Sequence, residues 1–163
     1  MKSRLLVNLA LAVLLAGLGL FAWLRPGPAT APEYRLSDLA PAAVQRLTIG
    51  RPGQPDLVLQ KRDADWHVIA PYAARADNQA VAHVLALLSA VSTQHFPADD
   101  PARFALDKPL LRLRLNKQEF VFGTQHPVSG EQYVATGDTV YLVSPSYLAD
   151  ALRLAADPAG TKP

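Results

Sequence analysis

The stretch from Thr124 to Tyr133, TQHPVSGEQY, gathers side chains that could act together in a binding site. An imidazole, a hydroxyl, a carboxylate and a phenol follow one another closely, on His126, Ser129, Glu131 and Tyr133. The stretch is also the longest polar connection between two predicted strands, and such loops present binding residues on a rigid sheet. Two interpretations stay open: a small polar ligand or interaction site, and a plain exposed hairpin connection, which is the simpler one.

Patterns that would support catalysis or metal binding do not occur in the sequence. Activated serines usually stand in Gly-x-Ser-x-Gly or Ser-x-x-Lys, and neither is found. The four histidines lie far apart in different predicted elements, which does not fit a zinc site. Asp63 with Asp65, and Asp99 with Asp100, lack the further donors of a calcium loop and suit turns better. There is also no cysteine and no phosphate-binding glycine loop. We therefore expect no enzymatic activity, no catalytic residues, no metal and no cofactor.

The segment from Leu5 to Leu24 contains no charged residue. At about 1.5 Å per helical residue it would span roughly the 30 Å of bilayer hydrocarbon. Lys2 and Arg4 precede it and outweigh Arg25 after it, so the N-terminus is expected to stay in the cytoplasm. The sequence predicts a single-pass protein of the bacterial inner membrane whose C-terminal domain is periplasmic.

A cleaved secretory signal is the competing interpretation of this segment. Such signals also begin with basic residues and end in small ones, here Ala29-Thr30-Ala31. The apolar run is longer than the roughly 7–15 residues of a signal core, and Pro32 directly after the small residues would hinder cleavage. We therefore expect a retained anchor.

The charges of the remaining chain do not favour binding to nucleic acid. Lys2, Arg4 and Arg25 flank the anchor, and removing these three from the 16 basic residues leaves 13, against 14 acidic residues from Glu33 onward. That part is therefore near neutral, at −1, and lacks the positive charge that nucleic-acid binders carry.

The first half of the exported part predicts an antiparallel meander. Pro71 ends its last strand, because proline has no amide hydrogen to donate to a sheet. On that strand Trp66 is expected to face the core and His67 the opposite side. Alternating apolar residues place the strands at positions 47–49, 57–60 and 66–70.

A helix is expected to follow the meander. Asp77 can accept hydrogen bonds from free amides of a helix that begins at Asn78. Apolar residues then recur at 3.6-residue spacing and form a stripe that needs a sheet to cover. The stripe consists of Val81, Val84, Leu85, Leu88 and Val91.

The second half repeats this order of strands and helix. Asn116-Lys117 and Gly137-Asp138 suit tight hairpin turns. A short helix, Tyr147 to Leu154, follows the last strand.

The expected fold of the whole chain is α+β. It begins with an N-terminal transmembrane helix, and antiparallel meanders of about six or seven strands follow, packed with one main helix and short helices. The meanders are expected to form two β-β-β-α-like halves. The predicted parts are an anchor at 1–24, a Pro/Gly/Ala-rich spacer and helical turn at 25–43, the exported domain at 44–154 and a flexible tail at 155–163.

Four segments, in this order, resemble a bacterial protein family, the domain of unknown function DUF4340. They are VQRLTIGR, DLVLQKRDADWHVIAPYAARAD, PARFALDKPLLRLRL and GEQYVATGDTVYLV, between about Val44 and Leu152. In that family the third segment usually reads Phe-Gly-Leu, where Ala105 stands here. The resemblance implies an exported or membrane-tethered α+β domain, and some relatives are encoded beside transport systems similar to gliding-motility ABC transporters. It brings no catalytic residues.

These observations predict a membrane-tethered, non-enzymatic accessory protein that contacts a membrane or envelope protein. The alternative is an exported domain that binds a small ligand or glycan through the loop at 124–133. In either case Trp66, Pro71, Asp77, Leu85 and Leu88 are expected to have structural roles.

Overall fold

The computed structural model describes residues 11–21 and 32–160. The chain divides into two compact units, and the second begins at Glu33. Residues 11–21 are helical. Nowhere in residues 11–21 and 32–160 is there a helix with both the length and the apolar character needed to cross a bilayer. The two ends of the predicted anchor, 5–10 and 22–24, and most of the spacer lie outside the described residues.

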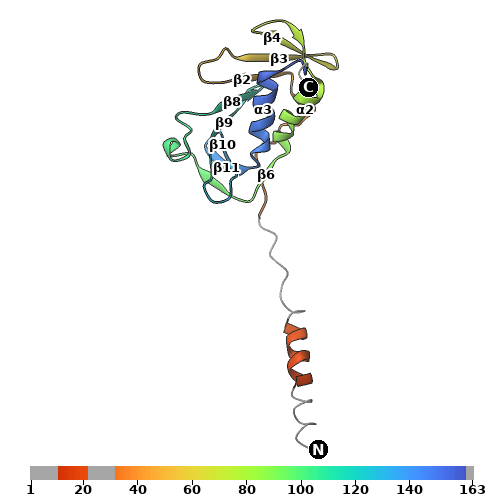
Figure 1. The fold of residues 1–163 in the computed structure, drawn as a ribbon, viewed down its shortest axis with the longest axis vertical. Coiled ribbons are helices and arrows are strands. Elements are labelled where there is room, and N and C mark those ends of the chain that lie inside the picture. The colour runs from red at the N-terminus through yellow and green to blue at the C-terminus, as the bar shows by residue number, and fades with distance from the viewer. Residues whose placement is uncertain (1–10, 22–31, 161–163) are drawn as a thin grey trace, which may run out of the picture. The chain divides into compact units, whose positions relative to one another are not determined.

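The second unit, here called the sheet domain, is built on one antiparallel sheet of nine strands (Figure 1). Their order across the sheet is β5-β4-β3-β2-β8-β9-β10-β11-β7, and β1 and β6 form a separate pair. The strands are β1 Tyr34–Arg35, β2 Arg46–Gly50, β3 Leu57–Arg62, β4 Asp65–Ala70, β5 Ala74–Arg75, β6 Val91–Ser92, β7 His95–Pro97, β8 Leu111–Leu115, β9 Gln118–Gln125, β10 Gln132–Thr136 and β11 Thr139–Val143. The helices are η1 Pro41–Ala43, α2 Asn78–Leu85, η2 Ala86–Ser89, η3 Pro101–Phe104 and α3 Ser146–Ala156. The predicted α+β class with antiparallel strands is confirmed.

Two meanders meet at the centre of the sheet. β2, β3 and β4 step outward on one side and are followed by α2, and β8 to β11 step outward on the other and are followed by α3. The two halves are joined where β2 pairs with β8, with Leu47 opposite Leu115 and Ile49 opposite Leu113. α2 and α3 contact each other and lie side by side in Figure 1.

The main core lies between this sheet and the two helices. On β8, Leu111, Leu113 and Leu115 are buried while the arginines between them are exposed, which is the period-two pattern of a strand with one covered face. Phe120 and Phe122 on β9 continue the same apolar surface. Each large side chain buried in this way stabilises the fold by roughly 1.5–3 kcal/mol.

Asp77 sets the start of α2 through two hydrogen bonds. At its start, Asp77 accepts a hydrogen bond from the Gln79 amide at 2.8 Å. Its own amide donates to the Pro158 carbonyl at 2.8 Å, so residues just beyond α3, in the segment predicted as a tail, pack on the start of α2.

The predicted apolar stripe is wrong at its last member. The chain becomes extended at Ala90, so Val91 belongs to β6 and is 48% exposed, while Leu88 is buried in η2.

The residues around the end of β4 lie where a strand gives way to a helix. Trp66 is 5% exposed and belongs to the main core, as do Leu85 and Leu88. His67, the next residue on the strand, has the opposite orientation. β4 ends at Ala70, and the peptide bond from Ala70 to Pro71 is cis.

A second, smaller core covers part of the opposite face of the sheet. Phe104 and Leu106, from η3 and the turn after it, pack on Ala135 and Val140. A Cβ atom on Gly123 would overlap the Phe104 carbonyl oxygen, so this close approach requires glycine in β9. Between the two covering residues, Ala105 adopts the left-handed conformation with φ 55° and ψ 35°.

We expect Ala105→Gly to stabilise the domain. A left-handed conformation costs an L-residue about 1–2 kcal/mol, and part of this gain is offset by the greater freedom of glycine in the unfolded chain. Urea unfolding should show an increase of about 0.5–1 kcal/mol in the free energy of unfolding. Ala102→Gly, in the right-handed turn of η3, is the matched control and should lower stability by a similar amount. Equal destabilisation by both substitutions would contradict the explanation.

Candidate functional site

The predicted polar loop connects β9 to β10 and has a fixed backbone shape. The His126 amide donates to the Glu131 carbonyl at 2.7 Å, and the Gly130 amide donates to the His126 carbonyl at 2.9 Å. Val128 stands at the tip of this turn and is 89% exposed. The loop is thus an ordered turn that presents one apolar side chain to solvent.

The His126 ring holds the turn from within. Its Nδ1 accepts a hydrogen bond from the Ser129 amide at 3.0 Å and a longer one from the Val128 amide at 3.4 Å. The Ser129 hydroxyl lies 3.1 Å from the same nitrogen. Because Nδ1 accepts from backbone amides, a neutral ring here carries its hydrogen on Nε2.

This arrangement does not activate Ser129 as a nucleophile. In a serine hydrolase the basic nitrogen accepts the serine proton while the other ring nitrogen donates to an orienting carboxylate. Here backbone amides already occupy the nitrogen next to Ser129. The Glu131 side chain has no hydrogen bond or ion pair within the described parts of the chain. The contacts therefore stabilise a turn.

Tyr133 contacts both the His126 ring of the turn and the smaller core. Its ring centroid is 4.9 Å from that of Phe104 and 6.4 Å from that of Phe96, so the ring packs on the smaller core. The His126 ring approaches its edge at 5.8 Å. The structure thus brings His126, Ser129 and Tyr133 together, with Tyr133 joining the turn to the segment that carries η3.

Gln132 is a site residue that sequence reasoning missed. It is fully buried, and its Nε2 donates to the carbonyl oxygens of Gly123 at 2.7 Å and Thr124 at 3.1 Å. These bonds hold the irregular register between β9 and β10. Its Oε1 has no hydrogen-bond partner among the described residues. The signal was available in the alternation, which places Gln132 on the same face as buried Val134.

A second polar cluster, also missed, ties β4 to α2 and β5. Asp65 accepts from the Asn78 side-chain amide at 2.8 Å and pairs with Arg75 at 3.0 Å. Asn78 Oδ1 in turn accepts from the Trp66 amide at 2.9 Å. The Asn78 hydrogen bond is the largest influence on the pKa of Asp65 and lowers it. Desolvation, the second largest, raises it, and Arg75 and His67 add smaller effects that lower it, so the pKa lies below its ordinary value.

In residues 11–21 and 32–160, no group of three or more histidine, aspartate or glutamate side chains is placed to hold an ion. The groups that the structure does bring together serve turn formation and the junction of strand and helix.

The family model for Domain of unknown function (DUF4340) matches residues 66–157. The chain belongs to this family. No curated protein matches the chain, and neither does any solved structure. The DUF4340 match begins on β4 and extends through α2, the 126–131 turn and α3, whereas β2 and β3 precede it.

We expect His126→Ala to loosen the turn without unfolding the domain. The substitution removes the acceptor of the Ser129 amide, and an intramolecular hydrogen bond contributes about 1 kcal/mol. Hydrogen exchange of the Ser129 amide should therefore become about fivefold faster. Glu131→Gln, which alters a side chain with no such bond, is the control and should leave the rate unchanged. An unaltered rate in the His126 variant would show that the ring does not hold the turn.

The polar cluster around Asp65 predicts that the sheet domain loses stability in acid. A carboxyl whose pKa is lower in the folded state stabilises the fold at pH values above its ordinary value of 3.8, and this contribution disappears as the pH falls through the lowered pKa. Asn78→Ala should raise the pKa of Asp65, measured by carboxyl NMR titration, and should flatten the decline of stability below about pH 4. Gln79→Ala, one residue further along α2, should do neither. The same Asp65 titration in wild type and Asn78→Ala would reject the assignment.

Proposed function

We propose that this DUF4340 protein is a membrane-tethered accessory protein with its sheet domain in the periplasm. In this proposal the segment from Leu5 to Leu24 anchors the chain in the inner membrane and the N-terminus stays in the cytoplasm. The sheet domain then contacts a membrane or envelope protein. The chemistry of the candidate loop, which forms a turn and activates no nucleophile, supports an interaction role over an enzymatic one.

The observation that carries the proposal is an apolar helix with no polar face. Within residues 11–21 every side chain is exposed, and the large apolar ones are 56–65% exposed. They are Leu11, Val13, Leu14, Leu15, Leu18, Leu20 and Phe21. These positions surround the helix axis, and a helix that is apolar on all sides belongs inside a large core or a membrane. The uncharged run extends beyond this stretch to a length of roughly 30 Å as a helix.

The distance between anchor and sheet domain restricts where a partner can be. Residues 25–32 contain four prolines and glycines in RPGPATAP. Fully extended, eight residues reach at most about 29 Å. A partner of the sheet domain would therefore lie close to the membrane surface. Some relatives are encoded beside transport systems, and by analogy we propose a component of a membrane transport system as the partner.

Cysteine labelling tests this topology cleanly, because the chain has no cysteine of its own. We expect a membrane-impermeant maleimide to label Ser129→Cys in intact spheroplasts and to label Ser3→Cys only after the membrane is permeabilised. Both variants should resist extraction by alkaline carbonate. A protein that appears in the soluble periplasmic fraction, shortened by its first thirty or so residues, would contradict the proposal.

A further inference from the structure

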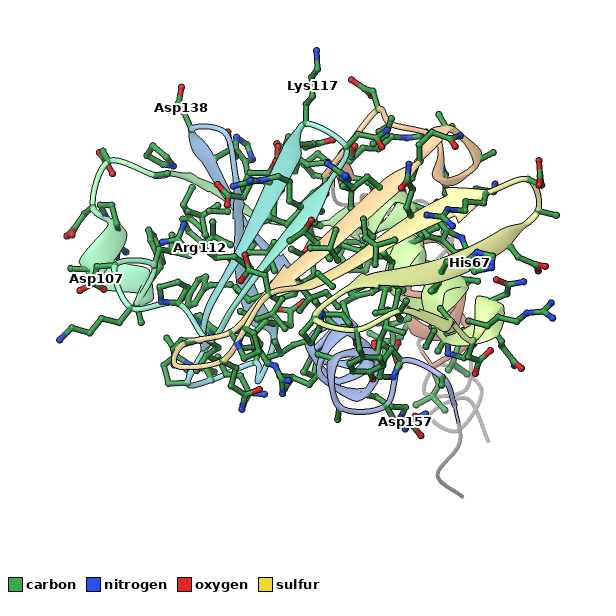
Figure 2. All side chains as sticks on the ribbon, turned by 90° about the horizontal axis from the view of Figure 1, so that it is seen from above. His67, Asp107, Arg112, Lys117, Asp138 and Asp157 are labelled. Atoms are coloured by element: carbon green, nitrogen blue, oxygen red, sulfur yellow. The ribbon has the colours of Figure 1, made fainter. Side chains whose placement is uncertain are left out.

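Among the residues of the sheet domain that the structure describes, only one half of the outer face of the sheet, opposite α2 and α3, is covered. The smaller core around Phe104 and Leu106 covers β9, β10 and β11. Over β4, β3, β2 and β8 the outward residues are half-buried or exposed. Figure 2 labels His67 and Arg112, which belong to β4 and β8 in this uncovered half. This half, here called the open face, is the part of the sheet available to a partner.

Arginine is the only permanently basic residue type that the strand alternation places on the open face. Arg114 pairs with Glu119 at 3.2 Å, and Arg75 pairs with Asp65 at 3.0 Å. The other three have no carboxylate within ion-pair distance in the described parts of the chain. The five arginines on this face and along its edges are Arg46, Arg62, Arg75, Arg112 and Arg114, and the acidic residues there are Asp56, Asp65 and Glu119. The open face therefore carries a charge of +2, whereas the sequence from Glu33 onward sums to −1.

The arginines at the centre of the open face follow a regular spacing. Arg112 and Arg114 are exposed on β8, two residues and so about 6.6 Å apart, and Leu110, just before the strand, is 50% exposed. Arg46 stands across on β2, diagonal to Arg114. Beside Arg112 lies a hollow of about 260 Å³ over Gly50, whose lining also includes Arg51 and Asp56. Arg112 and Arg114 thus occupy alternate positions on a central strand, with Arg46 on the strand beside it.

We propose that the open face binds an extended acidic segment of a protein partner, with acidic residues at alternate positions meeting Arg112 and Arg114. Alternate residues of an extended chain lie on one side at about the same spacing as these two arginines. Arg46 adds a third positive charge from the neighbouring strand, and Leu110 offers an apolar contact just before β8. The inference deepens the proposed interaction role by naming the chemistry of the partner.

The composition of the open face favours a protein over a nucleic acid or an anionic membrane. Guanidinium groups match the planar geometry of carboxylates, and Arg75 and Arg114 each already pair with a carboxylate through a single contact. Mixed arginine and apolar contacts are typical of protein interfaces. The negative charge of the rest of the domain would repel a polyanion that extends beyond the face.

Fluorescence anisotropy with a defined probe tests the proposal. The probe is a fluorescein-labelled peptide of five Glu-Ser repeats, added to the full chain in nonionic detergent, with a Gln-Ser peptide as the neutral comparison. We expect the acidic peptide to bind, to weaken with added salt, and to bind at least about tenfold more weakly to the Arg46→Gln, Arg112→Gln double variant. These two arginines have no acidic partner, so their replacement should leave the melting temperature nearly unchanged.

Two further variants distinguish binding at the open face from attraction of the peptide by the total charge of the protein. Arg35→Gln with Arg153→Gln removes the same charge from β1 and α3, away from the open face, and should leave peptide binding unchanged. Glu119→Gln frees Arg114 from its internal partner and should tighten binding about two- to fivefold. No binding to wild type, equal loss in both double variants, or tighter binding of a ten-residue oligothymidylate would overturn the proposal. Because the assay is performed in detergent, its failure would leave the labelling test of membrane topology unaffected.

Discussion

The pairing of β2 with β8 is the interaction on which the rest of the fold depends. Each meander alone would be a small sheet with one apolar face, and this pairing joins the two faces into a single surface wide enough for α2 and α3 to cover together. Leu47 and Ile49 on one strand and Leu113 and Leu115 on the other are at most 1% exposed at this junction. The residues matched by the DUF4340 family begin after β2 and β3, yet those strands separate β4 from β8 in the sheet. The matched segment therefore needs the strands before it to complete the domain.

Joining the two halves also determines which surfaces remain free. The helices occupy one face, and η3 with the turn after it occupies part of the other, where Phe104 and Leu106 pack on Ala135 and Val140. The turn that contains His126 is anchored to that covered part through Tyr133. The hairpin turns with Lys117 and Asp138 lie together at one end of the sheet (Figure 2). What is left is the open face, with Arg112 and Arg114 exposed on a central strand, and this is the surface that we propose to contact a partner.

The sequence predicted the secondary structure correctly where a residue pattern depends on interactions between neighbours along the chain. Alternating leucines identified β8, Gly137-Asp138 identified a hairpin turn, and Asp77 identified the start of α2, because these signals depend on neighbours along the chain. It was uninformative where contacts between distant segments decide the structure. β5 and β7 have two and three residues, too few for periodicity to show. The smaller core requires Phe104 to meet β10 and β11, and nothing local predicts that encounter.

The candidate loop shows the same division between local and distant causes. Its position between two strands and its polar composition could be predicted, since the flanking strands alternate clearly. The use of His126 as an internal acceptor could not, because the same residues in another turn geometry would leave its nitrogens free. Gln132 is intermediate: its burial follows from alternation, but its role in holding the irregular register depends on the backbone of β9.

The most direct test of the central claim is native-state hydrogen exchange on a variant that breaks the β2–β8 pairing. Thr48→Pro removes a ladder hydrogen-bond donor opposite Arg114 and cannot be accommodated in a central strand. If the two meanders form one cooperative unit, the amides of β4 and those of β10 should lose protection together and to the same extent. Continued protection of β10 with loss confined to β4 would show that the halves are independently stable, and would contradict the account.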